Sequence, residues 1–150
     1  MQKVTPFLWF DGQAEEAMHF YVGIFQNSKV LGVNGPPGQA FSVTFELDGQ
    51  KFHALNGGPQ YTFSPAVSFL VNCETQSEVD DLWSKLTAGG SEEPCGWLKD
   101  RYGLSWQIVP SILGRLIGDK DREKAGRAIQ AMLKMKKLDI AGLQRAFDGS

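Results

Sequence analysis

The 150-residue sequence has only two cysteines, Cys73 and Cys95, and no long apolar run. Two cysteines are too few for a disulfide framework, and they lack the Cys-x-x-Cys spacing of a metal site, so we expect two reduced thiols. No stretch approaches the roughly 18 apolar residues that cross a bilayer. The opening Met-Gln-Lys-Val-Thr-Pro lacks the apolar centre of a secretion signal. These absences predict a cytoplasmic protein without a membrane partner.

The sequence also lacks a large excess of either charge, because its formal net charge is -2. Residues 1–118 carry 7 Lys or Arg against 12 Asp or Glu, whereas residues 119–150 carry 8 against 5. Acidic residues at 119, 121 and 123 interrupt this basic tail, and no aromatic side chains alternate with its basic ones as a base-stacking surface requires. Nucleic acid is therefore not an expected partner. A hydrophobic fraction of 42% is ordinary for a globular domain.

The sequence contains two modules with the same order of predicted elements. The first runs over about residues 1–58, with strands at 4–10, 29–33, 40–47 and 51–55 and a helix at about 13–25. The second runs over 64–110, with strands at 66–71, 92–97 and 104–109 and a helix beginning at the capping-box sequence Thr75 to Glu78. We group both modules as 1–110. Gly49 and Gly103 precede matching strands, which aligns His53 with Gln107.

Residues 111–150 depart from this pattern. Apolar spacing predicts a helix over 121–136 and a further short helix over 138–147. We expect this helical extension to belong to the same domain or to a dimer interface.

Several sequence blocks resemble the PhnB-like branch of the glyoxalase, bleomycin resistance and dioxygenase (vicinal oxygen chelate) superfamily, whose members are often labelled 3-demethylubiquinone-9 3-methyltransferase. The blocks are Thr5-Pro6-Phe7-Leu8-Trp9-Phe10-Asp11-Gly12, Ala54-Leu55-Asn56-Gly57-Gly58-Pro59, Cys95-Gly96-Trp97-Leu98-Lys99-Asp100 and Ser105-Trp106-Gln107-Ile108-Val109-Pro110. The tail from Met132 to Ile140 is also similar to the family's ending. The resemblance implies an α+β, glyoxalase-like fold. Two βαβββ modules would form a curved mixed sheet around a cavity, with a C-terminal helical tail and commonly in a homodimer.

The resemblance also implies where a divalent metal would bind. The positions that hold metal in superfamily enzymes fall at or near Pro6, His53, Ala66 and Gln107. Pro6 and Ala66 have no side-chain donor atoms, so His53 and Gln107 are the remaining metal candidates, fewer than the three protein ligands of a catalytic zinc site. No glycine-rich loop follows the first strand, and the elements do not alternate as in a parallel nucleotide-binding fold, so we do not expect methyl transfer.

Strand alternation then predicts which side chains line the cavity. The ligand-pocket candidates are Leu8, Phe10, His53, Leu55, Ser68, Leu70, Trp97, Ser105 and Gln107. They describe an apolar cavity with a few polar groups, as a small organic ligand requires. Alternatively, His53 and Gln107 satisfy each other or a buried water.

Other chemically capable residues have weaker support. His53 is the candidate general base, because an imidazole exchanges protons near neutral pH. Cys95 has no base placed beside it, and His19 is expected to be exposed. Asp100 and Arg101 flank a turn where they would line the cavity mouth with Trp97 or serve as surface turn residues. We expect Trp9, Trp83 and Trp106 in the core.

Three functions remain open from the sequence. The first is a protein that binds a small organic molecule with little or no dependence on metal. The second is a metal-dependent lyase, isomerase or dioxygenase acting on vicinal oxygens. The third is a regulatory or interaction module whose basic tail makes the contacts.

Overall fold

A computed structural model describes residues 2–36 and 38–150. The chain divides into two compact units, Met1–Phe63 (unit 1) and Ser64–Ser150 (unit 2). Pro37, which belongs to the turn expected between the second and third strands, lies outside the described residues. Within them, no helix combines the length and apolar character needed to cross a membrane.

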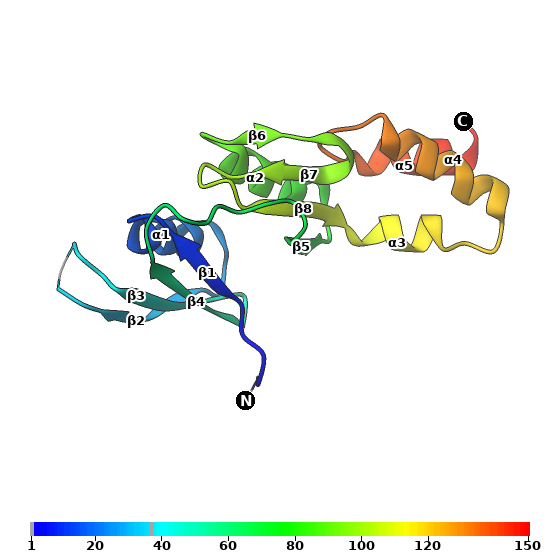
Figure 1. Cartoon of the computed structure of the whole chain (residues 1–150). Helices are drawn as coiled ribbons and strands as arrows, with labels where there is room; N and C mark the ends of the chain where they lie inside the picture. The colour runs from blue at the N-terminus through cyan, green and yellow to red at the C-terminus, as the bar shows by residue number, and fades with distance from the viewer. Residues whose placement is uncertain (1, 37) are drawn as a thin grey trace. The chain divides into compact units, whose positions relative to one another are not determined.

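Unit 1 has the predicted βαβββ order (Figure 1). Its elements are β1 (Phe7–Phe10), α1 (Ala14–Ile24), β2 (Lys29–Asn34), β3 (Ser42–Leu47) and β4 (Gln50–Asn56). The sheet has the strand order β1-β4-β3-β2. β1 runs parallel to β4 and the other neighbours are antiparallel, which confirms a mixed sheet.

The core of unit 1 lies between α1 and one face of this sheet. Met18 and Tyr21 are fully buried on α1. Tyr21 stacks on Phe45 of β3, and Phe45 stacks on Phe52 of β4 with ring centroids 5.3 Å apart. The β3–β4 hairpin forms because Asp48 and Gly49 adopt φ values of 46° and 84°, the paired positive angles of a tight two-residue turn.

Unit 2 repeats this order with shorter second and third strands and a 3₁₀ helix between them. Its first part contains β5 (Ser68–Cys73), α2 (Gln76–Thr87), β6 (Ser91–Glu92), the 3₁₀ helix η1 (Pro94–Gly96), β7 (Trp97–Lys99) and β8 (Ser105–Pro110). The strand order β5-β8-β7-β6 matches that of unit 1, and β5 is parallel to β8. Two βαβββ modules and the α+β class are thus confirmed.

Helix α2 begins where the sequence predicts it. Thr75 Oγ1 accepts a hydrogen bond of 3.1 Å from the Glu78 amide, and Glu78 reaches back to the Glu74 amide at 2.8 Å. These bonds satisfy amides that a helix start leaves without partners. The apolar stripe of α2 is buried: Val79, Leu82, Trp83 and Leu86.

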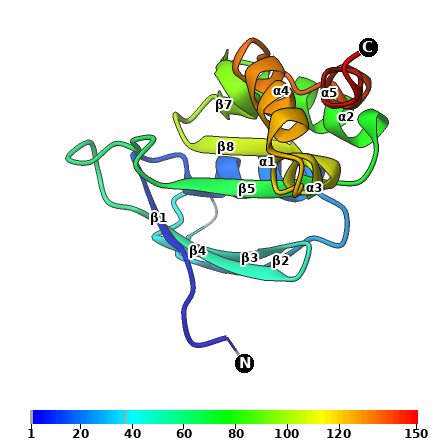
Figure 2. The same cartoon turned by 90° about the vertical axis from the view of Figure 1, so that its right-hand side faces the viewer.

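The tail folds as three helices that pack together beyond the end of β8 (Figures 1 and 2). They are α3 (Ser111–Ile117), α4 (Arg122–Leu133) and α5 (Ile140–Asp148). The sequence predicted α4 and α5 but not α3. Their buried cluster consists of Leu113, Leu116, Ala128, Leu138 and Leu143.

The segment between α4 and α5 attaches the tail to the second module. The Cys95 and Gly96 amides each donate a hydrogen bond of 2.8 Å, to the Met135 and Lys136 carbonyls respectively. On α2, the side-chain amide of Gln76 makes two bonds to the same segment. Its Nε2 donates to the Leu138 carbonyl at 3.0 Å, and its Oε1 accepts from the Ile140 backbone amide at 2.7 Å. The tail is therefore built into unit 2.

Candidate functional site

In unit 1, the sheet face opposite α1 gathers polar and aromatic side chains around His53. Alternation along β4 buries Phe52 and Ala54 on the α1 side and leaves His53 and Leu55 half-buried on the other. Residues paired across neighbouring strands share a face. The His53 face therefore includes Phe7, Trp9, Thr44, His53 and Leu55, and further along the same strands it carries Ser42, Glu46 and Lys51.

The register of β1 corrects the predicted pocket. Phe7 pairs with His53 and Leu8 pairs with Ala54, so Leu8 and Phe10 project toward α1, where they are 6% and 3% exposed. The expectation that Leu8 and Phe10 share the His53 face is therefore wrong. Their places are taken by Phe7 and Trp9, and the core assignment of Trp9 is wrong for the same reason.

His53 is held from two sides. A hydrogen bond of 2.9 Å joins its Nδ1 to Thr44 Oγ1 on β3, and the Phe7 ring lies 5.4 Å from the imidazole, centroid to centroid. Its backbone amide donates to the Pro6 carbonyl at 2.9 Å. Because Nδ1 is occupied, Nε2 is the ring nitrogen left for another group.

A tight loop fixes Trp9 on the same face. Its Nε1 donates a hydrogen bond of 2.9 Å to the Gly58 carbonyl, and its ring meets Tyr61 edge to face at 5.0 Å. A Cβ at Gly57 would lie 2.2 Å from the indole, so only glycine fits there. The indole is thereby held in one orientation beside Leu55, its partner across the strands.

The corresponding face of unit 2 surrounds Gln107. Two rows of side chains cross strands β5, β8 and β7: Leu70, Gln107 and Trp97 in one row, and Ser68, Ser105 and Lys99 in the next. The structure therefore places the five predicted pocket residues of this module, Ser68, Leu70, Trp97, Ser105 and Gln107, on one sheet face. The residues opposite, including Trp106 and Ile108, are buried on the α2 side.

Gln107 repeats the arrangement of His53. Its Nε2 donates a hydrogen bond of 2.9 Å to Ser68 Oγ on β5, as His53 pairs with a hydroxyl on β3. Each polar side chain thus has one hydroxyl partner from a neighbouring strand and lies half-buried beside apolar groups. Thr44 and Lys99 were not predicted for these faces. The sequence could have predicted the side on which Thr44 lies, because Thr44 stands between the apolar Val43 and Phe45 in an alternating strand.

The donor atoms do not form a metal centre in either unit. Among the described residues, no group of three or more His, Cys, Asp or Glu side chains is close enough to hold a metal ion. The His53 face supplies one free imidazole nitrogen, and the Gln107 face supplies an amide. A catalytic zinc site takes about three protein ligands, so the residues present do not fit one.

Several other candidates lie outside the two faces or have structural roles. His19 is exposed on α1 as predicted. Cys95 adopts a left-handed φ of 63° in η1, where its backbone contacts the tail. Asp100 is only 2% exposed, so it is not a surface turn residue. Its carboxylate accepts hydrogen bonds from the Tyr102 and Leu104 amides and from Trp106 Nε1, at 2.8, 3.1 and 2.9 Å.

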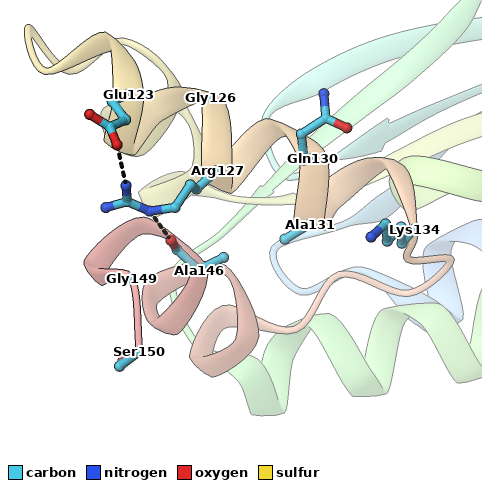
Figure 3. Close-up of a pocket in the computed structure, with 9 residues that line it drawn as sticks. All are labelled: Glu123, Gly126, Arg127, Gln130, Ala131, Lys134, Ala146, Gly149 and Ser150. Carbon is cyan, nitrogen blue, oxygen red and sulfur yellow. Dashed lines mark hydrogen bonds and ion pairs between the residues drawn. The ribbon is translucent and has the colours of Figure 1, made fainter.

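A hollow of about 690 Å³ lies between α4 and α5, away from the residues that the sequence singled out (Figure 3). Arg127 is its central cation. Arg127 Nε and Nη2 donate to the Ala146 and Phe147 carbonyls at 2.9 and 2.8 Å, and Nη1 lies 3.6 Å from Glu123 Oε1. The guanidinium therefore caps the C-terminal end of α5, which leaves the hollow without a free arginine for a ligand.

Solved structures show the class of this fold. FosX, a genomically encoded fosfomycin resistance protein from Listeria monocytogenes complexed with Mn(II) and sulfate, is 17% identical, with a TM-score of 0.54 over 77% of this chain and 99% of that chain. A glyoxalase/bleomycin resistance protein from Albidiferax ferrireducens is 14% identical, with a TM-score of 0.50 over 73% and 99%. The fold is glyoxalase-like.

Sequence similarity identifies the family more narrowly. A Bacillus cereus structure described as a putative 3-demethylubiquinone-9 3-methyltransferase, PhnB protein, is 36% identical, with a TM-score of 0.66 over 73% of this chain and 100% of that chain. The family model described as 3-demethylubiquinone-9 3-methyltransferase matches residues 2–109. The chain belongs to this PhnB-like family, and α3–α5 lie beyond the matched residues. No curated protein matches the chain.

Proposed function

We propose that the sheet faces that carry His53 in unit 1 and Gln107 in unit 2 bind small organic molecules, without requiring a metal. One observation carries this proposal. In both units, the last strand of the βαβββ module presents a half-buried polar side chain that is oriented by a hydroxyl and flanked by apolar or aromatic side chains, Phe7 and Leu55 beside His53, and Leu70 and Trp97 beside Gln107. Oriented polar groups within apolar surroundings are typical of small-molecule sites.

The two faces offer different contacts to a ligand. On the His53 face, Phe7 and Trp9 supply aromatic surface and His53 Nε2 supplies one hydrogen-bonding atom. On the Gln107 face, Leu70 and Trp97 supply apolar surface. Gln107 Oε1 is an acceptor there, because the bond to Ser68 uses the amide nitrogen. The cavity predicted for the two modules together stays a prediction.

Catalysis with a metal is the alternative that the family resemblance favours. It would need donors beyond the imidazole and the amide, since no three-ligand cluster exists among the described side chains. Metal-free catalysis would use His53 as a general base. In that case the substrate proton must come within hydrogen-bond reach of Nε2. Methyl transfer is not part of the proposal, because both sheets are mixed and lack the parallel order of a nucleotide-binding fold.

A regulatory role for the basic tail has less support. Lys137 pairs with Asp80 of α2 at 2.9 Å, and Arg127 caps α5. These two cations stabilise unit 2 itself. Basic residues used in this way are not available to contact a partner without loss of structure.

The proposal predicts that specific ligands lose affinity when His53 or Gln107 is truncated. Fragments that bind the wild-type protein in a ligand-observed NMR screen should bind His53→Ala or Gln107→Ala about tenfold more weakly, the effect of losing about one hydrogen bond. His19→Ala and Gln130→Ala are matched controls, since both residues are exposed on helices, and they should bind as wild type does.

The same samples test the metal alternative. Elemental analysis of tag-free protein, followed by titration with zinc, manganese, nickel and iron(II), measures whether His53→Ala removes bound metal. If the wild-type protein holds stoichiometric metal and His53→Ala holds none, the proposal that the site is independent of metal is overturned. Fragment binding that is unchanged in both face variants would overturn the site itself.

A further inference from the structure

The Ser105 hydroxyl is buried without a hydrogen-bond partner. Ser105 is 0% exposed and its Oγ finds no donor or acceptor among the described residues. A buried hydroxyl without a partner destabilises the folded chain, because it loses its hydrogen bonds to water without replacing them. Its position on β8 is on the Gln107 face, two residues before Gln107 itself.

The residue paired with Ser105 on β7 is a lysine. Lys99 is half-buried and pairs with Ser105 across β7 and β8. On the other neighbour of β8, strand β5, Ser68 also pairs with Ser105, so the three residues form one row across the sheet: Ser68, Ser105 and Lys99. None of the ion pairs seen in the described part of the chain involves Lys99. A partly buried lysine paired across the strands with a serine whose hydroxyl is unsatisfied is a combination that suits an acceptor with negative charge.

We propose that the row Ser68, Ser105 and Lys99, called the Lys99 row, binds an oxyanion group of the small molecule. This inference rests on the proposed function, because it assigns the chemistry of a ligand on the Gln107 face. The Lys99 row offers an ammonium and two hydroxyls, all capable of donating to the same oxygens. Neighbouring strands are about 4.8 Å apart, so one carboxylate or sulfonate group can reach donors on two adjacent strands.

The adjacent row explains what the rest of the ligand contacts. Leu70 and Trp97 flank Gln107 about 7 Å further along the strands, two residues at about 3.3 Å each. Leu70 is 51% exposed, so this row presents apolar surface. The two rows together suit a molecule with an anionic group at one end and an apolar or aromatic body at the other.

One carboxylate, that of Glu93, shares this face, because the Glu93 amide donates a hydrogen bond of 3.0 Å to the Trp97 carbonyl and so lies opposite Trp97. None of the ion pairs among the described residues joins Glu93 to Lys99. The other residues that strand pairing places on the face are Asn72 and Val109, together with Ser91 opposite Lys99 on β6. Glu92 points to the other side, where its carboxylate accepts a hydrogen bond from Trp83. Asp100 is engaged with Trp106 on that side as well.

The test uses two pairs of ligands that differ only in charge: benzoate against benzamide, and benzenesulfonate against benzenesulfonamide. Affinities are measured by NMR titration of the full chain. We expect wild type to bind each anion about tenfold more tightly than its neutral counterpart, the scale of one charge-assisted hydrogen bond. Lys99→Met should abolish this preference while retaining neutral-ligand binding, and Ser105→Ala should weaken both anions several-fold.

The controls separate a failed inference from a failed site. Lys99→Arg keeps the charge and should keep the preference for anions, and Lys120→Met removes a charge from an exposed loop position and should behave as wild type. If wild type binds anions and amides equally, or if Lys99→Met keeps the preference, the oxyanion inference is overturned while the small-molecule site stands. If no ligand of either pair binds, the outcome contradicts both proposals.

Discussion

Cys73 shows how strongly one buried position can alter protonation. Burial, together with the nearby carboxylates of Glu78 and Glu74, raises the pKa of its thiol from 9.0 to about 12. The thiol is 0% exposed at the end of β5. A neutral thiol suits this position, whereas a thiolate would be desolvated and repelled by both carboxylates.

This shift predicts a loss of stability at alkaline pH. An unfolded chain releases the Cys73 proton near pH 9, while the folded chain retains it until about pH 12, so unfolding becomes easier as pH rises between these values. The contribution of the thiol is complete below about pH 9 and declines by at most about 1.4 kcal/mol per pH unit above it.

Urea unfolding of wild type and Cys73→Ala at pH 7, 8.5, 10 and 10.5 measures the effect. The wild-type free energy of unfolding should fall more steeply above pH 9 than that of the variant. Cys95→Ala, which leaves the buried thiol in place, should follow wild type. Parallel curves for wild type and Cys73→Ala would show that the thiol does not titrate in this way.

At the same scale, alternation predicted the faces of β4 and β8 but not of β1. The β4 and β8 sequences alternate between polar and apolar residues around His53 and Gln107, so each face was readable. The β1 sequence Phe-Leu-Trp-Phe is apolar throughout and contains no period of two. Its orientation depends on the pairing of Phe7 with His53, a register that the local sequence does not encode.

Among the elements, the segment between α4 and α5 contributes most visibly to the integrity of unit 2. Leu138 is 0% exposed and lies against Gly96, where a Cβ would come within 2.9 Å of its side chain. Replacing Leu138 by Ala removes buried methyl groups and leaves a cavity beside η1. We expect Leu138→Ala to lower the free energy of unfolding by about 2–5 kcal/mol.

Leu133→Ala is the matched control, because Leu133 ends α4 and is 52% exposed. Chemical denaturation should show a change within about 0.5 kcal/mol for this variant. Equal effects of the two substitutions would mean that the segment is not anchored through Leu138.

The elements also show where sequence patterns lose information. The predicted strand at 92–97 is instead β6, η1 and β7, since Pro94 removes an amide donor and Cys95 and Gly96 adopt positive φ angles of 63° and 83°. Helix α3 was missed because its seven residues are too short for a clear helical period. The capping box at Thr75, by contrast, gave the start of α2 correctly.

At the scale of the whole molecule, the resemblance predicts a homodimer. Large apolar side chains are exposed in unit 1, among them Val30, Leu31 and Val33 on the edge strand β2. An uncovered edge strand with apolar side chains favours association. Light scattering of the purified chain should give twice the mass of one chain, and a single-chain mass at micromolar concentration would contradict the expectation.

The duplicated order of elements was the most predictable property of the molecule. Both modules were recognisable because Gly49 and Gly103 mark the approach to equivalent strands, and the family resemblance added the expectation of a mixed sheet. The hydrogen bonds of His53 with Thr44 and of Gln107 with Ser68 were not predictable. Each joins side chains of two strands, and their meeting depends on the register of those strands.

Because the segment around Leu138 bonds to Gln76 of α2, the two units become complete at different stages of synthesis. By the time residue 63 has been added, every strand of the first sheet already exists together with its pairing partners. The strands of the second sheet are complete at residue 110. The backbone amides of Cys95 and Gly96 and the side chain of Gln76 gain their hydrogen-bond partners only when residues 135–140 have been translated. Until the ribosome reaches them, unit 2 has its strands but lacks the segment that closes over η1.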